Sequence, residues 1–426
     1  MASFFIPLTG LESDSTALNT IANDLSNMNT TAFKAQTTNF ADLFYQQIGS
    51  TGAGNPIQVG AGVQVAANET EFSQGSINTT GNATDVALNG NGFFVVSNGV
   101  TDEYSRAGDF SLTSTGNLVT SSGLSVMGYP AVGGVVNTSS PLTAINIPVG
   151  RVQEPSATTT LNMTANLDSA AATGTAFPAQ VTVYDSLGVS HVATVTYTQT
   201  GTNTWSYSVA LPAGDFTSGT STPVTGSMTF DANGTLSTIT PTGAAAALTV
   251  GTAAGDVSSI PLSFTGLADG ATDLSISWNL LGTSGTPTIS QVDTASAVSA
   301  TTQNGYPSGQ YQSFTIGSDG TVTATYSNGQ EQAVGQVALA NVANVQGLQM
   351  LGDGDYATTL SSGTAAVATS GASGLGTMQD GALEESNVNI SAEFSDLIIA
   401  QRAFEANSKA VTTFDTVTQE TINMIH

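Results

Sequence analysis

The chain has 426 residues, of which 40% are hydrophobic and only 8% are charged, about a third of the charged share of an average globular protein. Its formal charge is −26, from 31 acidic and five basic residues, so it has too few Lys and Arg side chains to bind nucleic acid or an anionic membrane surface. It contains no cysteine, which excludes disulfides, thiolate metal sites and a thiol nucleophile.

The first predicted element is a helix over residues 1–28. Its large apolar residues recur at intervals of seven, three, four and three, which is the spacing of a helical seam: Leu11, Leu18, Ile21, Leu25 and Met28. Asn and Thr side chains in residues 27–31 compete for backbone hydrogen bonds and end the helix. The opening segment lacks a basic n-region and its apolar run stops at Pro7, so we do not expect a cleaved signal peptide.

The middle of the chain is predicted to be β structure. Phe93 to Val96 forms a short apolar strand between turns, and residues 103–120 have the pattern of a hairpin. Apolar residues alternate through 156–285, which favours an antiparallel sandwich or barrel. Val192, Val195 and Tyr197 form one of these groups of alternating apolar residues. A second hairpin is expected at 311–330, followed by a small-residue linker at 363–381.

After that linker the apolar period becomes helical again. Large apolar residues recur at intervals of seven, seven and fourteen, with two more between them, and form a C-terminal seam: Leu397, Ala400, Phe404, Val411, Phe414 and Ile425. Because this seam matches the N-terminal one in period, we expect the two terminal helices to pack together. The predicted fold class is mainly β with α-helical termini, a coiled-coil-like helix pair that carries nested, discontinuous antiparallel β domains.

The pairing of the termini predicts a chain organised in four parts, three of them made from two separate segments. They are a terminal helical inner-core domain (1–29 with 384–426), an extended connecting region (30–70 with 360–383), an inner β domain (71–147 with 286–359) and an outer β domain (148–285).

A single helix pair of this kind is marginal. Burying the five N-terminal seam residues contributes about 7–15 kcal/mol, whereas ordering the backbone of ~20 residues costs on the order of 1–2 kcal/mol each. We therefore interpret the seams as surfaces between subunits rather than as intramolecular packing alone. Lys34, Arg402 and Lys409 are expected to set the register by pairing with carboxylates of neighbouring subunits, namely Glu12, Asp14, Glu393 or Asp396.

Few residues are candidates for catalysis. Gly90-Asn91-Gly92 leads into a strand rather than a helix, which predicts a tight turn and not a nucleotide-binding loop. His191 and His426 are the only histidines, and no nucleophile-elbow motif accompanies them, which argues against a Ser-His-Asp hydrolase. We predict no catalytic residue and no cofactor.

Two acidic turns, at 231–234 and 352–357, offer paired oxygen ligands. Neither continues to the bidentate acid that an EF-hand loop requires. The first is better explained as a hairpin turn, and a weak surface calcium site at Asp353 and Asp355 is the minor alternative at the second. No metal site is predicted.

Four blocks of sequence resemble motifs of the flagellar rod and hook protein family. "IANDLSNMNTTAFKAQTTNFADLF" is similar to the family's N-terminal motif, A-N-N-I-A-N-x-N-T-T-G-F-K, through Asn27, Asn29, Thr30, Thr31, Phe33 and Lys34. "GNATDVALNGNGFFVV", "YSRAGDFSLTSTGNLVTSSGLSVMGY" and "GALEESNVNISAEFSDLIIAQRAFEANSKAVTTFD" resemble three further motifs in the expected order. Ala32 stands in place of the motif's Gly, which disfavours a positive φ there, so we expect the turn to be made differently or to be helical.

Length and the 156–285 insert resemble the hook-type members of this family rather than the shorter rod-type ones. The resemblance implies a non-enzymatic structural subunit that assembles with itself into a curved, flexible, extracellular tube and transmits torque from rod to filament. It also implies export through the flagellar type III apparatus without signal cleavage, and contacts with the distal rod protein, the hook cap scaffold and the hook-filament junction protein. Neither nucleic acid nor membrane insertion is implied. The alternatives are a distal-rod or other axial protein and a secreted β-rich adhesin.

Overall fold

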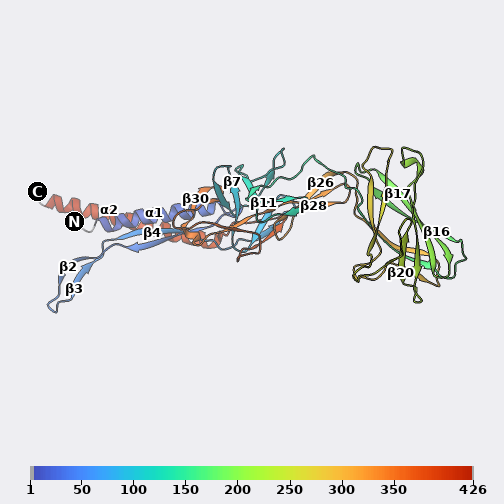
Figure 1. The fold of residues 1–426 in the computed structure, drawn as a ribbon. Helices are drawn as coiled ribbons and strands as arrows, with labels where there is room; N and C mark the ends of the chain where they lie inside the picture. The colour runs from blue at the N-terminus through green and yellow to red at the C-terminus, as the bar shows by residue number, and fades with distance from the viewer. Residues whose placement is uncertain (1–3, 425–426) are drawn as a thin grey trace. The chain divides into compact units, whose positions relative to one another are not determined.

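The computed structural model describes residues 4–424 (Figure 1). The chain folds into two compact units. The first unit comprises Met1–Val149, Ser313–Thr325 and Glu331–His426, and the second comprises Gly150–Gln312 and Tyr326–Gln330. Strands make up most of the regular structure and the two long helices lie at the termini. The predicted fold class is therefore confirmed.

The terminal helices are α1 (Phe5–Ser26) and α2 (Ile390–Met424). They lie side by side, with the two chain ends at the same end of the pair, so they run antiparallel (Figure 1). The predicted pairing of the termini is confirmed. Asn389 starts α2 because its side-chain oxygen accepts hydrogen bonds from the N–H groups of Ser391 and Ala392, which would otherwise lack partners.

The first unit also contains a two-stranded ribbon that packs on α1. It is formed by β1 (Gln36–Asp42) and β4 (Val63–Thr70), which pair antiparallel. Two short antiparallel pairs link segments distant in sequence: β5 (Ile77–Thr79) with β34 (Ala382–Glu384), and β6 (Val86–Asn89) with β33 (Thr377–Asp380). A local hairpin joins β2 (Gln46–Ser50) to β3 (Pro56–Val59).

The β body of the first unit is built around β7 (Phe93–Ser97), which is buried along its whole length. Its neighbours are β8 (Asp102–Ser105), β11 (Ser125–Val132) and β29 (Leu339–Asn341). The remaining strands are β9 (Ser111–Leu112), β10 (Leu118–Val119), β12 (Val135–Val136), β13 (Thr143–Ala144), β27 (Thr321–Tyr326), β28 (Glu331–Val337), β30 (Gln349–Gly352), β31 (Asp355–Ala357) and β32 (Ala366–Ala368), with the 3₁₀ turn η2 (Val345–Gly347).

Two local predictions in this unit need correction. The hairpin expected over 103–120 is shorter, because only β9 and β10 pair as its arms, while β8 pairs with β7. The small-residue segment 363–381 is not a plain linker, because β32 pairs with β29 and β33 pairs with β6. The side chain of Met378 in β33 is buried, and this apolar contact favours a strand over a free linker.

The second unit consists of two sheets that share one apolar core. One sheet is an antiparallel meander: β16 (Ala176–Tyr184), β17 (Ser190–Gly201), β18 (Thr204–Ala210), β19 (Val224–Phe230), β20 (Leu236–Pro241) and β21 (Leu248–Thr249). The other contains β15 (Thr160–Asp168), β22 (Ser259–Phe264), β23 (Leu274–Asn279), β24 (Ile289–Val292) and β25 (Ala297–Gln303). The unit also holds β14 (Val152–Gln153), the first residues of β26 (Gly309–Ile316) and η1 (Ala213–Asp215).

Aromatic side chains fill the centre of this core. Trp205 and Trp278 are fully buried, and the ring of Trp278 meets that of Tyr207 edge to face at a centroid distance of 5.7 Å. Inward and outward positions alternate along β17, so Val192 does not share a face with Val195 and Tyr197, with which the sequence pattern grouped it. Val192 is 42% exposed and His191 takes the buried position, because the side chains of a strand alternate with a strict period of two.

The second unit differs from the predicted outer domain in extent and in strand direction. It runs to Gln312 instead of 285, because β24 and β25 both pair with β15 and complete its sheet. The pairs of β15 with β23 and with β24 are parallel, so this sheet is mixed rather than purely antiparallel. The four-part organisation as a whole stays a prediction.

Candidate assembly surface

The face that α1 buries is not the predicted seam. Its buried residues are Pro7, Gly10, Ser13, Ala17, Thr20 and Asp24. Four predicted seam residues are only half-buried, and Met28, which lies beyond the last helical residue, is 40% exposed. The buried stripe has the same three-and-four spacing but is shifted by one residue, which rotates it by about 100° around the helix.

Small residues explain the shift, because they let α2 approach α1 closely. A Cβ atom on Gly10 would lie 2.6 Å from the side-chain Nδ2 of Asn407 in α2, so the Asn407 amide would have to move to admit it. The same Asn407 Nδ2 donates a hydrogen bond to the Asp14 carboxylate at 2.8 Å. The same stripe also meets β1, because Thr20 bonds to Thr38 and Asp24 accepts from the Gln36 N–H. The leucines of the predicted seam lie beside this stripe and keep part of their surface exposed.

On α2 the predicted seam is the half-buried stripe, yet no described residue of this helix is fully buried. Leu397, Ala400, Phe404, Val411 and Phe414 are each half-buried, and Ile425 lies outside the described residues. Other apolar side chains of α2 are more than half exposed: Phe394, Ile398, Ile399, Val417, Ile422 and Met424. An apolar surface of this kind is typical of a protein–protein contact.

A buried ion cluster fixes the segment that follows α1. The Lys34 ammonium is completely buried, pairs with the Glu384 carboxylate and donates a hydrogen bond to the carbonyl oxygen of Ser73 at 2.9 Å. The Arg106 guanidinium lies 3.1 Å from the same carboxylate. It also donates to the carbonyl oxygens of Gly90 and Gly92 at 2.7 and 2.8 Å, so it anchors the predicted tight turn.

Lys34 was expected to pair with a neighbouring subunit, and that expectation is wrong because its partner is in the same chain. Burial lowers the pKa of Lys34, although the hydrogen bond and charge of Glu384 oppose this effect. Burial likewise lowers the pKa of Arg106, again against the charge of Glu384. Two cations thus share one buried carboxylate, and neither would be stable at this site without it.

The turn around Ala32 also departs from expectation. Ala32 has a φ of +53°, in the left-handed region that Gly adopts more readily. Its N–H donates to the carbonyl oxygen of Glu384 at 2.8 Å, and its side chain is 2% exposed. The surrounding contacts therefore impose the conformation in spite of the methyl group.

The rest of the family motif forms the turn itself. The Thr30 hydroxyl donates to the Asn27 side chain at 3.1 Å, Thr31 and Phe33 are half-buried, and Asn29 is exposed. Asn387, which the sequence did not single out, ties the turn to the C-terminal segment. Its Oδ1 accepts from the Ala35 N–H at 2.8 Å, and its Nδ2 donates to the Glu71 carbonyl oxygen at 2.7 Å.

A cavity of about 330 Å³ lies between α1, β1 and α2. Three carboxylates line it, those of Asp14, Glu393 and Asp396, together with Ala17, Thr20, Ile21, Gln36, Thr37, Thr38, Phe40, Ile399, Ala400 and Ala403. Burial raises the pKa of Glu393, and the nearby carboxylates of Asp24 and Asp396 raise it further. The cavity is therefore an electronegative site with walls of mixed polar and apolar side chains.

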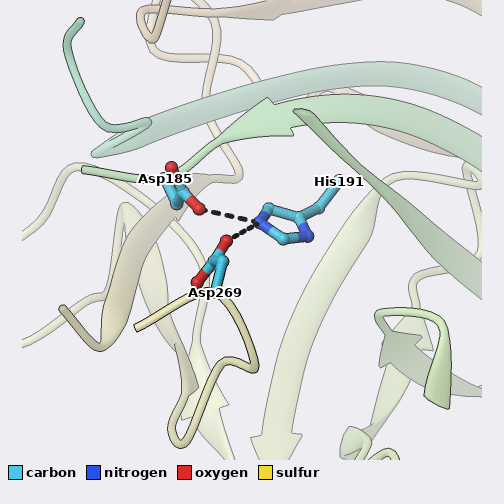
Figure 2. Close-up of side chains that lie close together, drawn as sticks. All are labelled: Asp185, His191 and Asp269. Atoms are coloured by element: carbon cyan, nitrogen blue, oxygen red, sulfur yellow. Dashed lines mark hydrogen bonds and ion pairs between the residues drawn. The ribbon is translucent and has the colours of Figure 1, made fainter. Parts of the chain in front are cut away.

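The second unit contains a separate titratable cluster around His191 (Figure 2). His191 Nδ1 lies 2.8 Å from an Asp215 carboxylate oxygen, and Nε2 lies 3.1 Å from Asp185 and 3.7 Å from Asp269. Burial lowers the pKa of His191, but its hydrogen bonds to Asp215 and Asp185 outweigh burial and the net shift is upward. Burial raises the pKa of Asp185, yet hydrogen bonds from Asp269, His191 and the backbone reverse this effect, and the net pKa is lowered.

This cluster is also where metal-ligand atoms converge. Asp185, His191 and Asp269 each offer one such atom, all within 4.8 Å of one another, and within residues 4–424 no other such group of three is found. An imidazolium held by carboxylates explains the same contacts. Asp353 and Asp355, the alternative calcium site, do not belong to such a group, and the Asp355 carboxylate instead accepts from the Ser122 hydroxyl at 3.3 Å.

Comparison with known proteins connects this architecture to one family. The flagellar basal body protein FlaE D2-domain model matches residues 153–306, the hook protein FlgE/F/G D1-domain model matches 87–166, and the basal body rod FlgEFG C-terminal model matches 379–424. The flagellar hook protein FlgE of Escherichia coli K12 is 36% identical over 99% of this chain and 100% of that protein. The chain belongs to the flagellar hook protein family. FlgE of Treponema pallidum is 33% identical over 100% of this chain and 99% of that protein.

The hook-protein family also matches in fold. The crystal structure of Helicobacter pylori flagellar hook protein FlgE2 superposes with a TM-score of 0.53 at 14% identity, covering 71% of this chain and 99% of that one. The predicted hook-type membership is confirmed, and the chain is a structural subunit of the flagellar hook. No helix within residues 4–424 combines the length and apolarity needed to cross a lipid bilayer.

Proposed function

We propose that this chain polymerises with itself into a curved, flexible, extracellular tube that transmits torque from the rod to the filament, and that the terminal helices form the contacts between subunits. The observation that carries this proposal is the solvent exposure of α2, which has 35 residues and no buried one. A helix of this length gains most of its stability from packing. Contact with α1 covers one side of α2, and neighbouring copies would cover the other.

Within this proposal the predicted seams act at the edges of the helix pair. On α1 the residues are Leu11, Leu18, Ile21, Leu25 and Met28, and on α2 they are Leu397, Ala400, Phe404, Val411, Phe414 and Ile425. The described seam residues other than the exposed Met28 are half-buried, which is consistent with this role, because they retain exposed surface that a second copy can bury. The exposed Ile398 and Ile399 would extend the same contact.

The other partners follow from the same role. A hook subunit would be exported by the flagellar type III apparatus without signal cleavage, assemble beneath a hook cap scaffold onto the distal rod protein, and end at a hook-filament junction protein. A distal-rod protein is the second candidate, but the large second unit favours the hook. A secreted β-rich adhesin would leave the paired terminal helices without a role, and an enzyme would need a catalytic site that neither seam nor ion cluster offers.

Negative-stain electron microscopy of the purified chain under polymerising conditions tests the proposal. Curved tubes are the expected result, whereas straight short rods or permanently monomeric particles would contradict it.

A truncated chain lacking residues 1–28 gives a second test. We expect a soluble chain that keeps its β fold and cannot polymerise, because the second unit has its own core and the helix pair is lost. Loss of the β signal in the circular dichroism spectrum would contradict this proposal, and so would tubes formed by the truncated chain.

A further inference from the structure

The five basic residues divide into two groups by their surroundings. Lys34 and Arg106 are buried on Glu384, whereas Arg151, Arg402 and Lys409 are exposed. Within residues 4–424 none of these three exposed side chains makes an ion pair. In a chain of formal charge −26, Arg402 and Lys409 are the positive charges that α2 can offer to a carboxylate of another copy.

Arg402 and Lys409 lie on the same side of α2. They are seven residues apart, so they project from one face about 10.5 Å apart along the axis. That face is opposite the one that carries Ala400 and Asn407, which meets the cavity and α1. Neither cation can therefore reach the acidic cavity of its own chain.

The cavity between α1, β1 and α2 has the complementary chemistry. Its carboxylates are those of Asp14, Glu393 and Asp396, and only Asp14 among them has a hydrogen-bond donor from the neighbouring helix, Asn407. Asp24 does not line the cavity, but its buried carboxylate lies close to Glu393, and within the described residues its Oδ1 has no hydrogen-bond partner. Within the described residues no cationic side chain lines the cavity.

The entrance of the cavity fits a long basic side chain. Ile399 is 65% exposed and Phe40 is 49% exposed at its rim, and Asp396 is exposed beside them. Lys and Arg bury their methylene stems on apolar surface while their charged heads bind carboxylates. A guanidinium also bridges two carboxylate oxygens in a fixed geometry.

We propose that the acidic cavity of one copy receives the Arg402–Lys409 face of α2 from a second copy. This inference rests on the proposed self-assembly and names the contact that sets its register. The Arg402–Lys409 face and the acidic cavity lie on opposite sides of α2, so the contact between two copies is head-to-tail. A head-to-tail contact repeats into rings or open helical filaments instead of closing a two-fold dimer.

Charge reversal and charge exchange test this contact. Arg402→Asp should raise the critical concentration for polymerisation at least about tenfold, because it places an acid against the acidic cavity. Asp396→Arg should do the same from the other side. The matched controls are Arg151→Asp and Asp293→Arg, which make the same charge changes at exposed positions of the second unit and should polymerise as the unaltered chain does.

The decisive measurement mixes the two variants. A one-to-one mixture of Arg402→Asp and Asp396→Arg should polymerise, since each cavity then meets a face of opposite charge, and the double variant should polymerise alone. Normal assembly of Arg402→Asp, or failure of both the mixture and the double variant while the controls assemble, would overturn the proposed contact and leave self-assembly standing. Failure of the unaltered chain to polymerise would instead overturn the proposed function itself. Circular dichroism should show unchanged helicity in all variants, because the substituted side chains are exposed.

Discussion

The buried Glu384 carboxylate should be indispensable to the first unit. Glu384→Gln keeps the size of the side chain but leaves the Lys34 ammonium and the Arg106 guanidinium buried without a counter-charge. Removing one member of a buried ion pair costs about 3–5 kcal/mol. For a unit of this size about 1 kcal/mol shifts the melting temperature by about 2–4 °C, so the expected loss is about 6–20 °C.

Two probes separate the units in this experiment. Trp205 and Trp278, the two tryptophans of the chain, both lie in the second unit, so tryptophan fluorescence follows its unfolding. Helical circular dichroism follows the first unit, which holds α1 and α2. We expect Glu384→Gln to lower the helical transition and leave the fluorescence transition in place.

The adjacent Glu385 provides a matched control, because it is exposed and Glu385→Gln is the same chemical change. This control should be within about 0.5 kcal/mol of the unaltered chain. If Glu384→Gln were no more destabilising than Glu385→Gln, Glu384 would not hold the two buried cations and the account of this cluster would be wrong.

Two further predictions concern His191 and Ala32. The raised pKa of His191 in the folded chain means that its contribution to stability is full below the unfolded value of about 6.5 and is lost as the pH rises through the folded pKa. The fluorescence-detected melting temperature should therefore fall over that range, and an equally steep fall in His191→Gln would contradict this. Ala32→Gly should raise the free energy of unfolding by about 1 kcal/mol in urea titrations, because relief of left-handed strain, about 1–2 kcal/mol, exceeds the entropy that glycine costs, about 0.4–1 kcal/mol. A clear loss of stability in Ala32→Gly would mean that burial of the methyl group outweighs the strain.

Periodicity predicted both terminal helices but not the face that α1 buries. The stripe of leucines and the stripe containing Gly10 and Ala17 have the same spacing and differ by one residue. Hydrophobic size favours the first stripe, whereas close approach of the two helices selects the second, because a side chain at Gly10 would collide with Asn407. That choice depends on the partner helix, about 400 residues away in sequence.

The ion cluster illustrates the same limit. Lys34 was recognisable as one of only five basic residues, and its isolation suggested an ion pair. Its partner Glu384 is 350 positions away and in a segment with no local signal for burial. The pairing of β5 with β34 brings that segment beside the turn after α1, so only the assembled fold reveals the pair.

Local pattern and composition were enough to assign the class of this protein, through its helical ends, its β middle, its scarcity of positive charge and the four motifs that mark the family. These features are local or compositional, so no contact is needed to recognise them. Long-range contacts set the buried face of α1, the positive φ of Ala32, the inclusion of 286–312 in the second unit and the acidic cavity beside α2. Each of these depends on segments that are distant along the chain, and local preference gives way wherever such contacts are stronger.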